Sequence, residues 1–427
     1  MATSTRLGRI PLTALPAQAL SHRARPRIAL MLVLIAAAMP VRIPAALPLV
    51  HSMSVLDILL WFAAVTLVLD CAVRPLNVAY PQLFSLLFLP VFVCVVSLAW
   101  SQDPAATLRS TMIYVEGLVA YLLVVRELDG LPAGRVMTYL KRYTYLVMIP
   151  AVLLLLHVPG FAPQEAGLSP RSGSYVSYYT RLSHPVLGRS NNLATVLVFF
   201  VPLLLYWGHT RRDRRFTTAG FVVLTAVVLT LSRGVLLALL VTAVVAALGW
   251  AVRHRGIDGR IVAKAIGAVA AAVTGITLFD RFNPSTQEFI GGRLSLDNVM
   301  IRSDLVSAAV HKLSDRPFLG YGGGVVPDQD PTLAIKAHNT YLQQAIYYGL
   351  PLGLVVTLSL VCLAAFFLHR AGRTALASVV GFTVAVQMLI FVTESSFEGT
   401  VLRVLFYLSI GFGAALVRAA EAPSGAP

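Results

Sequence analysis

The sequence predicts an all-α integral membrane protein of about twelve transmembrane helices, with one large helical loop on one side of the membrane. Of its 427 residues, 57% are hydrophobic and only 12% are charged, whereas soluble domains are about 45–50% apolar and about 25% charged. The mean hydropathy is +0.77. The apolar residues also come in runs of about 20, the length at which a helix crosses a bilayer. A water-soluble fold could not bury so much apolar surface.

The apolar runs set the domain organisation. A basic segment, 1–27, precedes helices one to nine in 28–279, a polar loop occupies 280–345, helices ten to twelve lie in 346–418, and a tail follows at 419–427. The predicted spans are 28–48, 53–71, 82–100, 110–126, 144–160, 191–208, 217–232, 234–252, 262–279, 346–368, 375–392 and 401–418.

The first span is interrupted by Pro40, Arg42 and Pro44. Proline removes a backbone donor and disfavours a continuous helix. A kinked or re-entrant segment is therefore the alternative at this position.

The net charge of +15 would suggest a nucleic-acid partner in a soluble protein. Here the basic residues lie in short runs between apolar spans, which is the pattern that sets membrane orientation. We therefore expect no nucleic-acid partner, and we place both termini in the cytoplasm. The cytoplasmic runs include Arg126, Arg135, Lys141, Arg142, Arg211, Arg212, Arg214, Arg215, Arg253, Arg255, Arg260 and Lys264.

Other polar residues fall inside or beside the apolar spans, where ionisable groups are costly. We interpret most of them as side chains that hold the bundle together or that extend to the membrane surface. These are Asp57, Asp70, Arg109, Glu116 and Arg403. The three cysteines, Cys71, Cys94 and Cys362, lack the spacing of metal ligands and are interpreted as packing residues.

Two arginines favour a functional interpretation. Arg233 occupies a very short turn between two spans, and Arg189 begins a span. A helix N-terminus favours an anion, so an arginine there is suited to a phosphate that both groups contact. The alternative for both residues is a side chain that simply reaches the membrane surface.

The 280–345 loop has the pattern of a folded unit. Its apolar spacing predicts an amphipathic helix over 299–314 that carries Arg302 and ends before Pro317. The glycine-rich stretch that follows predicts a turn or a close approach of the backbone to a ligand. His338 lies where the loop joins span ten. Histidine accepts a proton near neutral pH, so it suits a general base.

A metal site is the alternative source of positive charge. Asp328-Gln329-Asp330 has the spacing of a D-x-D carboxylate pair, but Pro331 follows directly and indicates a turn. Because nearby arginines could neutralise the same charge, we expect no metal and no cofactor.

Three motifs together resemble the O-antigen ligase and polymerase family of bacterial membrane glycosyltransferases. They are Leu231-Ser232-Arg233-Gly234, Arg302 followed by Arg316-Pro317-Phe318-Leu319-Gly320-Tyr321-Gly322, and His338-Asn339-Thr340-Tyr341-Leu342 followed by Tyr348-Gly349-Leu350-Pro351-Leu352-Gly353. Their order and spacing fit the family over residues 188–360.

The resemblance implies a GT-C-like enzyme of the bacterial inner membrane with its site facing the periplasm. The donor would be a glycan on undecaprenyl pyrophosphate, the acceptor a sugar hydroxyl of lipid A–core, and the product lipopolysaccharide. The reaction would be metal-independent and inverting. Arg189, Arg233 and Arg302 would hold the pyrophosphate, Arg293 would be a fourth candidate, and His338 would be the base.

Other functions remain open at this point. Within the family, the alternatives to a ligase are an O-antigen polymerase and a protein O-oligosaccharyltransferase, which would use a similar donor. A transporter of lipid-linked sugars is the alternative from another class, because it would also combine twelve spans with internal arginines.

Overall fold

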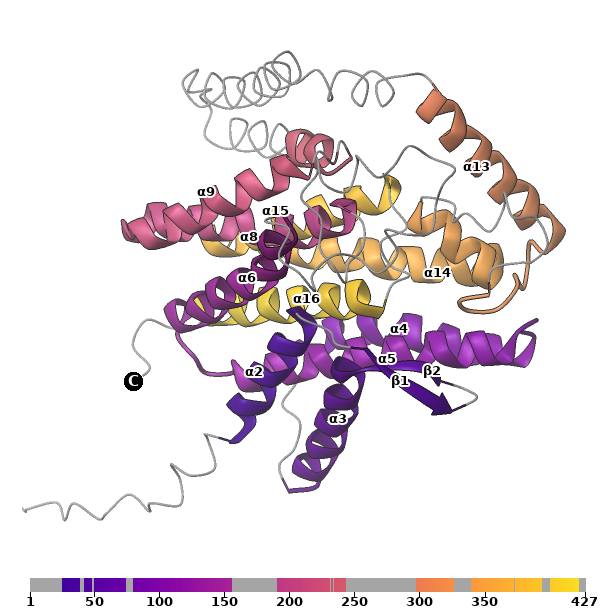
Figure 1. Cartoon of the computed structure of the whole chain (residues 1–427), viewed down its shortest axis with the longest axis horizontal. Helices are drawn as coiled ribbons and strands as arrows, with labels where there is room; N and C mark the ends of the chain where they lie inside the picture. Colours follow the sequence, from indigo (N-terminus) through magenta and orange to yellow (C-terminus); the bar gives the residue numbers. More distant parts are fainter. Residues whose placement is uncertain are drawn as a thin grey trace, which may run out of the picture.

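The structure is a computed structural model. It describes residues 25–38, 42–47, 50–73, 80–155, 190–230, 232, 234–242, 297–325, 339–371, 373–393 and 400–421. Figure 1 shows a bundle of roughly aligned helices, with α2, α3 and α13 set at an angle to it. The elements are α2 (Arg25–Ala38), β1 (Arg42–Leu47), β2 (Val50–Ser54), α3 (Val55–Val73), α4 (Pro81–Val96), η1 (Ser97–Ala99), α5 (Pro104–Glu127), α6 (Ala133–Leu155), α8 (Ser190–Arg211), α9 (Arg214–Leu229), α13 (Asp297–Asp315), α14 (Thr340–Arg370), α15 (Ala375–Thr393) and α16 (Thr400–Glu421).

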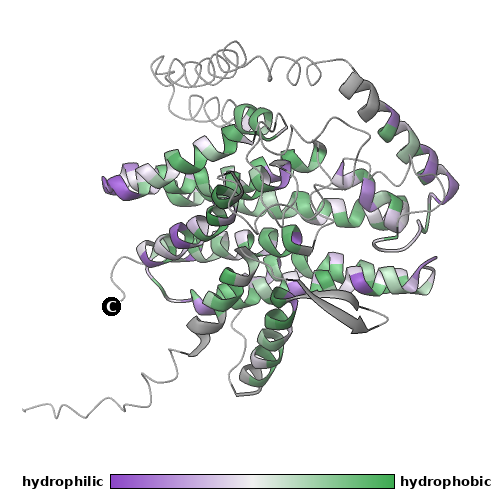
Figure 2. Ribbon diagram, in the orientation of Figure 1, coloured by the Kyte–Doolittle hydropathy of each residue, from purple (hydrophilic) through white to green (hydrophobic). Residues whose placement is uncertain are grey.

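Six helices in the described part of the chain are long and apolar enough to cross a membrane. They are α4 with η1, α5, α8, α14, α15 and α16. Figure 2 shows hydrophobic residues along these helices and hydrophilic residues concentrated near several helix ends. The prediction of a multi-pass, helical membrane protein is therefore confirmed. The number twelve stays a prediction, because segments such as 262–279 lie outside the described residues.

The first predicted span, 28–48, is wrong in its extent. α2 ends at Ala38, and 14 residues rise only about 21 Å, less than the roughly 30 Å of a bilayer core. Strands β1 and β2 follow as an antiparallel hairpin that pairs Ile43 with Met53. Prolines near this break cannot supply the backbone donors that a continuing helix needs.

α16 is the central helix, since 89% of its most apolar stretch is buried inside the bundle. Gly117 on α5 allows α16 to come close, because a Cβ there would lie 2.8 Å from the ring of Tyr407. Tyr143 on α6 joins the same core and places its ring centroid 5.8 Å from Phe200 and 6.2 Å from Phe412. The aromatic contacts thus connect α6, α8 and α16.

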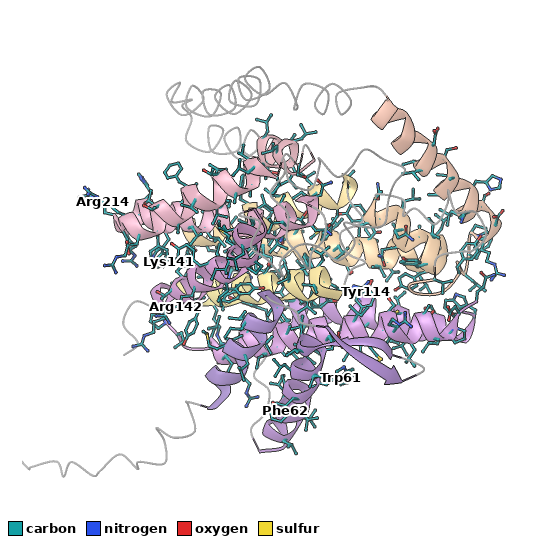
Figure 3. All side chains as sticks on the ribbon, in the orientation of Figure 1. Trp61, Phe62, Tyr114, Lys141, Arg142 and Arg214 are labelled. Carbon is teal, nitrogen blue, oxygen red and sulfur yellow. The ribbon has the colours of Figure 1, made fainter. Side chains whose placement is uncertain are left out.

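Basic residues gather at one end of the bundle. Arg370 lies 2.8 Å from the Glu421 carboxylate, and Arg418 lies 2.6 Å from that of Asp129. Figure 3 labels Lys141, Arg142 and Arg214 at the same end of the molecule, on the left of the view. This arrangement fits the positive-inside rule, by which this would be the cytoplasmic end.

The opposite end of the bundle, called here the site end, is where α4 and α15 finish and where α5, α8 and α16 begin. α13 and the turn after it lie at this end (Figure 1). The starts of α8 and α14 and the end of α9, which flank several of the predicted functional residues in the sequence, belong to this end.

Candidate active site

α14 consists of two legs that meet at Gly349. This residue has φ 74° and ψ 170°, which is not helical. A Cβ on Gly353 in the second leg (350–370) would lie 2.6 Å from the Cα of Ala345 in the first leg (340–348). In one straight helix these residues would be about 12 Å apart. The chain therefore turns back at Gly349, and the first leg runs beside the second as a re-entrant segment.

The first leg is anchored between α5 and α15. The Tyr114 hydroxyl of α5 donates to Gln344 Oε1 at 3.2 Å, and the Tyr341 hydroxyl donates to the backbone oxygen of Met388 on α15 at 2.9 Å. Asn339 is the N-cap of the leg, and its Oδ1 accepts a hydrogen bond from the Leu342 amide at 3.0 Å. The start of this helix therefore lies among the spans.

The turn after α13, residues 316–325, holds the corner of α14 and is called here the clasp turn. A broken helix leaves backbone groups without their usual partners. The clasp turn supplies the missing hydrogen-bond partners. The Gly322 amide donates to the Tyr347 oxygen at 2.8 Å, and the Leu350 amide donates to the Pro317 oxygen at 2.7 Å.

The glycines of the clasp turn serve these contacts. Gly320 has φ +66°, and a Cβ there would lie 2.5 Å from the Gly349 amide nitrogen. At Gly322, with φ +106°, a Cβ would overlap the Ser101 side chain. The sequence analysis expected these glycines to form a turn or to let the backbone approach a ligand closely. The structure shows a turn, and the backbone of this turn closely approaches the corner of α14.

The helix predicted over 299–314 is confirmed as α13, and its C-terminal half packs on the first leg. Ala309 shares a buried cluster with Tyr321 and Ile346. The Tyr321 hydroxyl donates to the backbone oxygen of Lys312 at 3.2 Å. Burial raises the pKa of Tyr321 above its ordinary value, so the phenol stays neutral and a donor.

A pocket lies between α8, α15 and α16. Gln387, which lines it, is 3% exposed, and its Oε1 has no hydrogen-bond partner among the described residues. The next residue along α15, Met388, is the one that Tyr341 contacts. The pocket is lined by Thr195, Val196, Gln387, Phe391, Leu402, Leu405, Phe406 and Ser409. The sequence analysis did not single out Gln387; its signal was an amide within an otherwise apolar span.

The predicted site residues lie mostly outside the described part of the chain. Arg302 is on α13, but its side chain is not among those described. The residues that lie outside are Arg189, Arg233, Arg293 and His338. For Arg189, Arg233 and His338 an adjacent residue is described. Ser190 begins α8, Asn339 precedes the first leg, and Ser232 is 1% exposed in the turn that carries Arg233.

Two ionisable side chains within the apolar helices hold the bundle together, as the sequence analysis expects. Arg403 on α16 is 2% exposed, its guanidinium lies 3.7 Å from the ring centroid of Tyr114, and it donates to the Ser110 backbone oxygen at 3.2 Å. Glu116 on α5 accepts a hydrogen bond from the Trp61 indole of α3 at 3.0 Å. Figure 3 labels Trp61 and Tyr114. Arg403 therefore links α16 to α5, and Glu116 links α3 to α5.

Within the described ranges, no three His, Cys, Asp or Glu side chains come together as a metal site would require. Asp328 and Asp330, the carboxylates of the alternative metal interpretation, lie outside those ranges.

Residues 218–357 match the family model described as O-antigen ligase. Over these residues the chain is similar to the O-antigen ligase family. The matched region starts within α9, ends within α14, and contains Arg233, Arg293, Arg302 and His338 but not Arg189. A search of curated proteins found no match. The match covers about a third of the chain and supports the predicted resemblance to the O-antigen ligase and polymerase family.

Proposed function

We propose that this protein is an O-antigen ligase. It transfers a glycan from undecaprenyl pyrophosphate to a sugar hydroxyl of lipid A–core, at the periplasmic face of the bacterial inner membrane. The observation that carries the proposal is the re-entrant first leg of α14, which begins among the spans directly after His338. A pyrophosphate leaving group is an anion, and a helix N-terminus among the spans is suited to bind one.

The first leg is suited to an anion for a physical reason. The N-terminus of a helix carries a partial positive charge, and broken membrane helices direct such ends at anionic substrate groups. Tyr341, near the start of the first leg, contacts Met388, and the adjacent residue Gln387 lines a mostly apolar pocket. In such surroundings, fixed dipoles act more strongly on a developing charge than they do in water.

The packing of α8 on α9 supports a paired role for Arg189 and Arg233. The glycines at 208 and 220 set the register, since they contact Thr217 and Leu205 respectively across the hairpin. Ser190 begins α8 and α9 ends at Leu229, so the described residues that flank Arg189 and Arg233 in the sequence belong to the site end of this hairpin. Two guanidinium groups at this end could bind the oxygens of one pyrophosphate.

Arg302 would approach the same site from α13. It lies three and seven residues before Leu305 and Ala309, which are both buried. Residues at that spacing share one face of a helix. The sequence spacing therefore predicts that Arg302 shares a face of α13 with Leu305 and Ala309. Arg293, four residues before α13, is the fourth candidate.

In the proposed reaction, His338 removes the proton of the acceptor hydroxyl. The resulting oxygen attacks the anomeric carbon opposite the pyrophosphate, which leaves with the electrons of the glycosidic bond, so the anomeric centre is inverted. The arginines stabilise the charge that develops on the leaving group, and no metal ion is required. These roles fit a GT-C-like lipid-donor glycosyltransferase.

Reconstitution tests this function. The purified chain would be placed in lipid nanodiscs with a lipid-linked glycan and a lipid A–core acceptor, and the products would be separated by mass. We expect glycan joined to lipid A–core. A product in which one lipid-linked glycan has been extended by another would indicate a polymerase, and unchanged donor found across a sealed vesicle membrane would indicate a transporter.

A further inference from the structure

The clasp turn exposes two large apolar side chains at adjacent positions. Phe318 is 75% exposed and Leu319 is 54% exposed. Exposed apolar clusters of this kind mark contact with another molecule or with a membrane.

The second leg of α14 shows where the lipid-facing surface ends. Its 21 residues, 350–370, rise about 30 Å, which equals the thickness of a bilayer core. Since Arg370 lies at the basic end, Leu350 lies at the opposite boundary of the hydrocarbon region. One face of this leg carries half-exposed apolar side chains at three- and four-residue spacing, namely Leu350, Leu354, Leu358 and Val361.

The clasp turn continues this apolar face. The Leu350 amide, at the end of this apolar face, donates to the Pro317 oxygen at 2.7 Å. Phe318 is the next residue after Pro317, so it lies close to that end. The indole N–H of Trp100, at the site end of α4, donates to the Leu319 oxygen. Tryptophan is enriched at the interface between the hydrocarbon and the headgroups. Two independent contacts thus put the clasp turn at interface depth.

Charge at the clasp turn also fits a lipid headgroup region. Arg316 is exposed, with its guanidinium 5.4 Å from the ring centroid of Tyr321. A long basic side chain beside inserted apolar residues can reach lipid phosphates while its stem stays on apolar surface.

We propose that Phe318 and Leu319 insert into the leaflet at the site end of the bundle. The clasp turn is then a membrane anchor that holds α13 and the corner of α14 at the lipid surface. This inference does not depend on glycan transfer, because it rests on exposure, depth and charge alone. The rival occupant of the same surface is a second copy of this chain.

Depth-dependent fluorescence quenching tests the anchor. In full-length protein with its cysteines replaced by alanine, a single cysteine would be introduced as Phe318→Cys or Leu319→Cys and labelled with an environment-sensitive fluorophore. Ser314→Cys is the matched control, because Ser314 is exposed on the last turn of α13. If removing Cys94 harms folding, it can be kept, since it is 0% exposed in the folded protein.

In nanodiscs containing lipids with a nitroxide high on the acyl chain, we expect the labels at 318 and 319 to lose most of their fluorescence. The label at 314 should lose little. Equal, weak quenching at all three positions would overturn the proposal, because the clasp turn would then lie in water. A blue-shifted label at 318 that lipid nitroxides do not quench would also overturn it, and would indicate a second protein copy.

Discussion

His338 is the residue on which the proposed chemistry depends, because a hydroxyl attacks well only after a base takes its proton. We expect His338→Ala to abolish transfer while the protein remains folded in the membrane. The test is a transfer assay on purified protein, with thermal unfolding measured alongside. Transfer by a folded His338→Ala protein at the wild-type rate would remove this residue from the mechanism.

Substitutions at Arg233 can distinguish the effect of its positive charge from the effect of the shape of its guanidinium. If its guanidinium binds two pyrophosphate oxygens, Arg233→Lys should fail almost as badly as Arg233→Ala, because lysine keeps the charge but loses the planar fork. A lost charge-assisted hydrogen bond costs about 1.5–3 kcal/mol, which is about one to two decades in rate. Initial transfer rates of the two mutants, at matched membrane levels, make the comparison.

The opposite outcome has a clear meaning. A side chain that only reaches the membrane surface would accept lysine freely, since lysine does the same. The burial of neighbouring Ser232, at 1% exposure, argues against a freely exposed turn. If Arg233→Lys transfers glycan at nearly the wild-type rate, Arg189 and Arg302 become the better candidates for the phosphate contact.

At the residue scale, the sequence identified charges that are costly in lipid but not the partners that explain them. Arg403 and Glu116 were correctly interpreted as bundle-holding. Their partners, Tyr114 and Trp61, could not be predicted because they come from other helices. Gln387 was missed for the same reason. Its side chain lines a pocket formed with two other helices, and the sequence of its own span does not reveal that pocket.

At the scale of the element, the corner of α14 requires glycine. At Gly349 an alanine would take a φ of +74°, and its Cβ would overlap the Phe318 backbone oxygen. Gly130 is the matched control, because it has a φ of +69° and a methyl added there would meet no described atom within 4 Å. The left-handed backbone alone costs about 1–2 kcal/mol for a residue with a Cβ. We expect Gly349→Ala to lower the thermal unfolding midpoint and the transfer rate clearly more than Gly130→Ala does.

Fluorescence-monitored unfolding in detergent gives the midpoints for both variants. Equal shifts would mean that the clasp turn yields easily and that the contact between the clasp turn and the corner contributes little to stability. Retained transfer in Gly349→Ala would mean that the corner does not position the site.

The sequence predicted α13 closely, because its apolar spacing is helical and Pro317 follows its end. It did not predict the corner of α14. The signal was present in Gly349-Leu350-Pro351, where a flexible residue precedes one that lacks a donor. A long apolar run conceals such a break, since both legs are equally hydrophobic.

At the scale of the whole molecule, hydropathy predicts the bundle well, because lipid imposes helices of nearly fixed length. The first span failed where prolines and an arginine made the hydropathy ambiguous, and a short hairpin formed instead. The resemblance to the family rests on three short motifs that occur in the expected order. The contacts between the second and third motifs, such as that of the Gly322 amide with the Tyr347 oxygen, could not be predicted from the sequence.

Charge neutralisation by arginines rather than by a metal has a consequence for the whole enzyme. We expect the purified protein to remain active in EDTA, because the guanidinium groups would supply the positive charge that the leaving group needs. The measurement compares transfer rates with and without chelator. Activity that is lost to EDTA and restored by Mn²⁺ or Mg²⁺ would assign Asp328 and Asp330 as ligands.

The ligase function itself is tested most directly by lipopolysaccharide banding on a gel from a strain that lacks this gene. The proposal predicts that all long bands disappear, that the lipid A–core band remains, and that long polymer accumulates on its lipid carrier. Complementation with the intact gene should restore the long bands. A core band carrying one repeat unit, without long bands, would contradict a ligase and indicate a polymerase, and an unchanged ladder would contradict both.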